Sequence, residues 1–189
     1  MRRNFWINML FFQLAWPACV VGAAYGQLWP SLLLVACFSV WQLQRERAHP
    51  ADRWLVGLFA VTGLIVDTVW IQTGLLAYSA AGPWPSLTPI WLLALWVSLG
   101  LAVNHSLRYF REHWVQWGLL LCIASPFSYW MAKRIGAVEW LADDWIVLLA
   151  LGPGWAVLVG GLFALANAMD QSVARPSSAF TTARERTTK

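Results

Sequence analysis

The stretch from Trp54 to Gly74, WLVGLFAVTGLIVDTVWIQTG, limits the possible folds more than any other part of the chain. It has about the 20 mostly apolar residues that a helix needs to cross a bilayer, and it carries a single carboxylate, Asp67. Only 12% of the 189 residues are charged and 59% are hydrophobic, whereas soluble domains carry about 25% charged residues. Such a chain has too little polar surface to cover a soluble globule, so we predict an integral membrane protein.

Six apolar runs predict an all-α bundle of six transmembrane helices, which together form one domain over residues 1–169. The predicted helices cover residues 5–26, 30–43, 54–74, 90–107, 114–131 and 145–169. The stretch 75–89 is uncharged and rich in proline, glycine and serine, which favours an interfacial loop. Residues 170–189 are rich in serine, threonine and arginine, which predicts a disordered cytoplasmic tail.

The basic residues predict the orientation of these helices, because Lys and Arg collect in cytoplasmic loops. With the N-terminus in the cytoplasm, two of the 13 basic residues, Lys133 and Arg134, lie outside. The opposite orientation reverses that ratio. We therefore expect both termini in the cytoplasm and a multi-pass protein of a bacterial inner (plasma) membrane.

Asp67 is the main candidate functional residue. An ionised carboxylate within the hydrocarbon is costly, so it is expected to face the protein interior and find a partner. Its helical face carries small residues, which indicate a close helix contact: Ala60, Gly63 and Gly74.

The depth of Asp67 suggests its neighbours. A rise of 1.5 Å per residue places it about 20 Å from the cytoplasmic side, at the level of Trp96, Ser128 and Tyr129. Asp67, Ser128 and Tyr129 therefore form the first candidate polar cluster. Two roles stay open: an acid that orients a ligand or exchanges protons, and a polar clamp between helices.

The run Asn104-His105-Ser106 is a second candidate. Asn104 and Arg108 form an i, i+4 pair, and His105 lies near the cytoplasmic boundary, about 12 Å in depth from Asp67. His105 is therefore not expected to pair with Asp67. It could shuttle protons or bind a headgroup, although a satisfied interfacial histidine is the more common case.

Lys133 and Arg134 depart from the charge rule, and two explanations stay open. They could contact an anionic headgroup at the outer leaflet, or they could pair locally with the acidic residues Glu139, Asp143 and Asp144.

No pattern of residues predicts a metal site or a cofactor. The three cysteines lie inside apolar runs without CxxC spacing, and no HxxH or HExxH pattern occurs. Most of the 15 tryptophans fall near predicted membrane boundaries, where indole is favoured. The less clearly interfacial ones either line a cavity or fill the bundle: Trp16, Trp91, Trp96 and Trp155.

Several of these residues also carry a family resemblance. Asn104 to Leu107, the aspartate at Asp67, and the stretch Ser125-Pro126…Tyr129…Gly136-Ala137 resemble the domain of unknown function 2878. This is a family of small bacterial inner-membrane proteins, and the resemblance reaches to about Ala166. It implies a polytopic bacterial membrane protein, encoded near functions that modify membrane fatty acids, but no established activity.

The scarcity of convergent polar groups favours a function other than catalysis. The leading hypothesis is a lipid-binding protein or partner subunit in membrane-lipid modification or envelope maintenance. Its expected partners are membrane lipids and another membrane protein, not nucleic acid. The alternative is a small proton-coupled transporter or membrane enzyme that uses Asp67.

Overall fold

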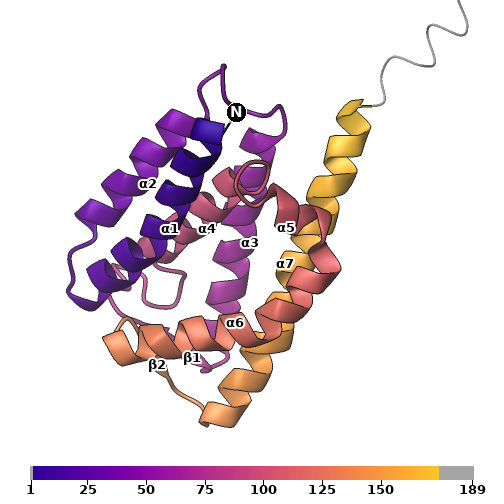
Figure 1. Cartoon of the computed structure of the whole chain (residues 1–189). Coiled ribbons are helices and arrows are strands. Elements are labelled where there is room, and N and C mark those ends of the chain that lie inside the picture. The colour runs from indigo at the N-terminus through magenta and orange to yellow at the C-terminus, as the bar shows by residue number, and fades with distance from the viewer. Residues whose placement is uncertain (1, 175–189) are drawn as a thin grey trace, which may run out of the picture.

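The computed structural model describes residues 2–174 and is helical apart from one short two-stranded ribbon (Figure 1). The elements are α1 (Arg2–Ala24), α2 (Trp29–Gln42), α3 (Asp52–Gln72), β1 (Leu76–Tyr78), α4 (Ile90–Ala102), α5 (Arg108–Glu112), α6 (Trp114–Ile135), β2 (Val138–Trp140) and α7 (Asp144–Ala174). The all-helical architecture expected from the apolar runs is thereby confirmed.

Helix α3 shows how the sequence produces the packing. Its buried side chains recur at steps of three and four residues, as one face of a helix requires: Asp52, Leu55, Phe59, Gly63 and Asp67. The opposite face exposes Val61, Ile65 and Val69. One stripe of α3 therefore packs into the protein with a carboxylate near each end, roughly 22 Å apart along the helix.

The helices form two groups. Helices α1, α2, α3 and α4 pack on one another, with α4 in contact with the other three. Close approach of α3 and α4 needs Gly100, where a Cβ would lie 2.9 Å from the Val56 Cα.

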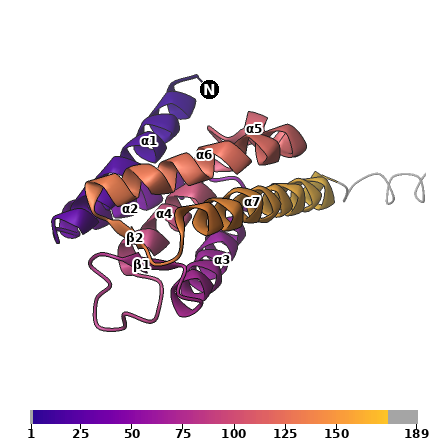
Figure 2. The same ribbon diagram turned by 90° about the horizontal axis from the view of Figure 1, so that it is seen from below.

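The second group is the pair α6 and α7, which lie side by side (Figure 2). A Cβ at Gly152 of α7 would lie 2.7 Å from the Cys122 carbonyl oxygen of α6, so the two backbones nearly touch there. Pro126 lies inside α6, and the half of the helix that follows runs across the lower end of α1 toward β2 (Figure 1).

The β1–β2 ribbon joins the two groups at the end of the molecule opposite the N-terminus; we call this the ribbon end. The strands are antiparallel, with Leu76 opposite Trp140 and Tyr78 opposite Val138. Gly136, in the left-handed conformation (φ 91°), ends α6 and turns the chain into β2. Residues 75–89, predicted to be an interfacial loop, therefore begin with a paired strand that holds Tyr78 in the interior.

Three predicted boundaries are wrong by four residues or more. Helix α6 continues to Ile135 rather than ending at residue 131. Helix α4 ends at Ala102 rather than at residue 107, and turns carry Asn104, His105 and Ser106. Helix α7 continues to Ala174, so the first residues of the predicted disordered tail are helical. The rest of that tail, residues 175–189, lies outside the described residues.

Within residues 2–174, three helices are long and apolar enough to cross a membrane: α1, α3 and α7. Helices α2 and α4 are apolar but have 14 and 13 residues, about 20 Å of helix against a hydrocarbon core of about 30 Å. Large apolar side chains are exposed on α1, α3 and α7 and on α6, among them Leu10, Ile65, Val157 and, on α6, Ile123. Exposed apolar surface of this extent suits contact with lipid, and the chain is associated with a membrane.

Candidate functional site

The Asp67 carboxylate is fully buried and accepts three hydrogen bonds from neutral donors. The Trp96 indole N–H donates to Oδ2 over 2.7 Å, and the Tyr78 hydroxyl donates to Oδ1 over 2.9 Å. The Tyr129 hydroxyl donates to Oδ1 over 3.3 Å. Burial raises the pKa of the Tyr78 phenol well above its usual range, so this hydroxyl keeps its proton and remains a donor.

A glycine makes this arrangement possible. Gly63 lies one turn before Asp67 on the buried face of α3, and a Cβ there would lie 2.2 Å from the Trp96 ring. The Trp96 ring therefore occupies the space beside the α3 backbone, with its N–H directed at the carboxylate. On its other side, Trp96 stacks on Trp155 of α7, with ring centroids 4.9 Å apart and planes inclined by 13°.

These large rings span the space between the two helix groups and border a cavity of about 530 Å3. The cavity is flanked by α1 and α4 on one side and by α6 and α7 on the other. Along α6 it reaches from Trp117 to Ala132, which is about four turns of helix. Its size is in the range of small-molecule sites, roughly 300–1,000 Å3.

The walls of the cavity are aromatic and aliphatic, and no charged side chain of the described residues lines it. The hydroxyls that line it, those of Tyr78, Ser98, Ser125, Ser128 and Tyr129, are its main polar groups. All four tryptophans that were less clearly interfacial in sequence lie on its walls: Trp16, Trp91, Trp96 and Trp155. They therefore border a cavity, which is one of the two roles that the sequence left open.

The cavity reaches the molecular surface between α1 and α6. Gln13 on α1 and Leu120 and Ala124 on α6 line it and are exposed. The surface beside this opening carries exposed apolar side chains: Leu10 and Leu14 on α1, and Leu119, Ile123 and Phe127 on α6. The opening therefore lies on an apolar surface of α1 and α6 that is suited to contact with lipid.

Of the first predicted cluster, the structure brings Tyr129 to Asp67 but not Ser128, which lies on the cavity wall. Tyr78 was missed as a partner of Asp67. The only signal for it was an aromatic hydroxyl shortly after the glycine turn that ends α3, and its position depends on pairing with a strand 60 residues later in the chain.

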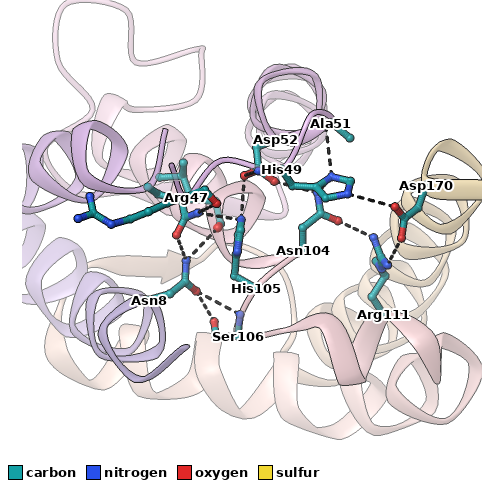
Figure 3. Close-up of polar contacts among 12 residues, drawn as sticks. Asn8, Arg47, His49, Ala51, Asp52, Asn104, His105, Ser106, Arg111 and Asp170 are labelled. Atoms are coloured by element: carbon teal, nitrogen blue, oxygen red, sulfur yellow. Dashed lines mark hydrogen bonds and ion pairs between the residues drawn. The ribbon is translucent and has the colours of Figure 1, made fainter. Parts of the chain in front are cut away.

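A second polar cluster lies at the end of the bundle opposite the ribbon and is centred on Asp52 (Figure 3). Asp52 is fully buried. Its carboxylate accepts from the His49 backbone N–H and from Asn104 Nδ2, each over 2.8 Å, and lies 2.8 Å from His105 Nε2. Because α4 ends at Ala102, the turn that follows can direct Asn104 and His105 toward the start of α3.

Buried amides extend this Asp52 cluster to α1 and α2 (Figure 3). Asn8 Nδ2 donates to Gln42 Oε1 over 2.7 Å, and the Ser106 hydroxyl donates to Asn8 Oδ1. Gln42 Nε2 lies 2.8 Å from His105 Nε2. The sequence analysis did not identify three members of this cluster, Asn8, Gln42 and Asp52. A single polar residue near the end of a predicted membrane helix is usually assigned to the membrane–water interface rather than to a buried cluster.

Arg111 connects the Asp52 cluster to α7. It is buried, donates to Asn104 Oδ1, and pairs with Asp170 across 2.7 Å. The predicted pair of Asn104 and Arg108 is wrong, because the helix breaks between them. Arg108 instead forms an exposed pair with Glu112.

The predicted headgroup residues have local partners. Lys133 Nζ lies 2.8 Å from Asp144 Oδ1 and 4.3 Å from the centre of the Trp140 ring. The Arg134 guanidinium lies 5.6 Å from the centre of the Trp130 ring. These contacts agree with the local pairing considered above, and headgroup contact stays a prediction.

The two clusters offer different chemistry. Among residues 2–174, no three His, Cys, Asp or Glu side chains gather as a metal ion would require. The Asp52 cluster satisfies its polar groups mainly with one another and ties together the ends of five helices. The Asp67 cluster instead presents all three of its donor side chains, Tyr78, Trp96 and Tyr129, at one end of an apolar cavity.

Comparison with known proteins identifies one family. A family model described as a protein of unknown function, DUF2878, matches residues 5–161. No curated protein and no solved structure matches the chain.

Proposed function

The chain belongs to the DUF2878 family, whose description gives no activity, and we propose from the geometry of the cavity that it binds the hydrocarbon part of a membrane lipid. One observation carries this proposal: an apolar cavity that opens between α1 and α6, on a surface of exposed apolar side chains. A hydrocarbon chain can enter from the bilayer without crossing water. Such a protein would serve lipid modification or envelope maintenance, alone or as a partner subunit.

A second predicted function, a proton-coupled transporter or a membrane enzyme, would need Asp67 to meet a substrate or exchange protons. Asp67 is fully buried behind Tyr78, Trp96 and Tyr129 and is not among the residues that line the cavity. The geometry therefore supports lipid binding better.

We extend the proposal to topology: six spans in a bacterial inner membrane, with both termini in the cytoplasm. Supporting this, the α2–α3 connection and the start of α3, which carry Arg45, Arg47 and Arg53, lie at the same end of the bundle as the N-terminus (Figure 1). The end of α6, which carries Lys133 and Arg134, leads directly into the ribbon. The shorter helices α2 and α4 would cross with local thinning of the bilayer, which costs fractions of a kcal/mol per Å of mismatch.

A hydrocarbon probe that lacks a polar headgroup tests hydrocarbon binding. The purified protein in lipid nanodiscs is illuminated with a hexadecane that carries a diazirine, and labelled residues are mapped by mass spectrometry. We expect labelling of cavity residues such as Leu95 and Leu121. Ala124→Trp, which narrows the opening, should reduce it several-fold.

The matched control is Ile123→Trp, which introduces the same side chain at the neighbouring position on the exposed face of α6. It should leave cavity labelling unchanged. Labelling of the cavity that is no stronger than that of Phe38, a buried residue outside it, would refute hydrocarbon binding.

A further inference from the structure

We propose that the ribbon end of the cavity binds the hydroxyl group of an uncharged amphiphile and rejects an anionic head. The inference rests on the proposed function, since it names the head of the lipid whose hydrocarbon part the cavity holds. Two features carry it: the charge around Asp67, and the hydrogen-bonding groups left free beside it.

The charge balance disfavours an anion. No Lys or Arg of the described residues lines the cavity, and within residues 2–174 no cation forms an ion pair with Asp67. All three partners of Asp67 are neutral donors. A phosphate, sulfonate or carboxylate placed there would be removed from water without a counter-charge and set near a second acidic group, which is costly.

The free hydrogen-bonding groups match a hydroxyl. The hydroxyl hydrogens of Tyr78 and Tyr129 are directed to Asp67, so each phenolic oxygen keeps lone pairs that can accept. The Trp155 indole N–H is buried, lies beside the Tyr129 hydroxyl, and makes no hydrogen bond of normal geometry within the described residues. The rings of Tyr129 and Trp155 have centroids 6.2 Å apart.

A single hydroxyl can serve both groups, because it donates one hydrogen bond and accepts others. It would donate to the Tyr129 oxygen and accept from Trp155 Nε1, which removes the cost of an unpaired buried donor. A ketone or ester can only accept, and an ammonium can only donate. The remaining length of the cavity is mostly apolar and suits a single hydrocarbon tail.

Two probes of equal tail length test the proposal: hexadecanol and hexadecanesulfonate, each with the same mid-chain diazirine. The sulfonate stays ionised at any pH used. With the full-length protein in nanodiscs, and with each signal divided by lipid-facing labelling on Ile123, we expect the alcohol to label the cavity about tenfold more than the sulfonate, equivalent to about 1.4 kcal/mol.

Three variants assign that preference to residues. Asp67→Asn keeps the size of the side chain but removes its charge, so sulfonate labelling should rise while alcohol labelling changes less. Tyr129→Phe and Trp155→Phe each remove one hydroxyl contact and should lower alcohol labelling several-fold. Tyr109→Phe, at an exposed position on α5, should change neither probe.

The outcomes separate this inference from the proposed function. Equal labelling by both probes, or a preference for the sulfonate, would overturn the hydroxyl assignment, although hexadecane labelling would still support hydrocarbon binding. Full alcohol labelling in both folded Phe variants would also overturn it. Failure of all three probes to label the cavity would instead refute hydrocarbon binding itself.

Discussion

At the scale of single residues, Trp96 fits its position only because residue 63 has no side chain. The ring lies against the α3 backbone and donates to Asp67. In Gly63→Ala the new methyl group would overlap the ring, which must move and lose its hydrogen bond. We expect a loss of about 1–3 kcal/mol in stability from overpacking, seen as a lower midpoint of thermal unfolding in detergent.

Gly57→Ala is the control for that prediction, because it makes the same change on the same helix. A Cβ at Gly57 meets nothing within 4 Å, and alanine is favoured over glycine within a helix by up to about 1 kcal/mol. This variant should therefore unfold at the same temperature as the wild type or higher. Equal midpoints for the two variants would show that Trp96 does not need the space at Gly63.

The sequence predicted part of this site. Helical spacing indicated that Asp67 faces inward beside Gly63, and depth counting placed Tyr129 and Trp96 at its level; burial of Asp67 and its bonds to both residues agree with this. Tyr78 could not be found in this way, because a three-residue strand positions it. The hydrogen bonds of Asp52 were equally hidden, since they depend on where α4 ends.

At the scale of elements, α5 carries two arginines in contrasting surroundings. Arg111 is buried between Asn104 and Asp170, whereas Arg108 forms an exposed i, i+4 pair with Glu112. In Arg111→Gln, the α4–α5 turn loses its contact with α7 and leaves buried polar groups unpaired. Removal of one partner of a buried ion pair can lower the free energy of unfolding by about 3–5 kcal/mol. Because Asp170 is partly exposed and water can solvate its carboxylate, we expect a loss at the lower end of this range.

Thermal unfolding in detergent measures this loss, and Arg108→Gln is the matched control. Exposed ion pairs contribute about 0–1 kcal/mol, so this control should stay close to wild type. If both variants unfold at the same temperature, the Arg111–Asp170 ion pair between α5 and α7 stabilises the protein no more than a surface ion pair does.

The existence of the long helices was predictable because each is an extended apolar run. Their ends were less so, because polar contacts formed on folding decide them. Helix α4 stops five residues early, and the turn it leaves delivers Asn104, His105 and Ser106 to Asp52, Gln42 and Asn8. The ribbon was missed for a related reason: three-residue strands are too short to show an alternating pattern.

At the scale of the whole molecule, the cavity results from how the two helix groups meet. Large aromatic rings lie where the α6–α7 pair meets the other group, as in the stack of Trp96 on Trp155. Helices α1 and α6 make few close backbone contacts, which leaves space between them. No single run of sequence contains this feature. The five tryptophans that border the cavity come from α1, α4, α6 and α7, so only the assembled fold shows their common surface.

The arrangement of charge across the whole molecule leads to the last prediction, a test of the proposed topology. Glu46 is exposed in the α2–α3 connection and Glu112 at the end of α5, whereas Ser86 is exposed in the β1–α4 connection and Asp143 in the β2–α7 connection. Single cysteines are placed at these four positions after Cys19, Cys37 and Cys122 are replaced by alanine. A maleimide that cannot cross membranes is then applied to intact spheroplasts.

We expect rapid labelling of Ser86→Cys and Asp143→Cys, and labelling of Glu46→Cys and Glu112→Cys only after the membrane is opened. The physical reason is the excess of arginine at the N-terminal end, which retains those connections in the cytoplasm. A fully reversed pattern would contradict the orientation but not the spans. If Ser86→Cys and Asp143→Cys react from opposite sides, an odd number of crossings separates them. The bent helix α6, whose second half runs across the end of the bundle, would then be the segment that fails to span.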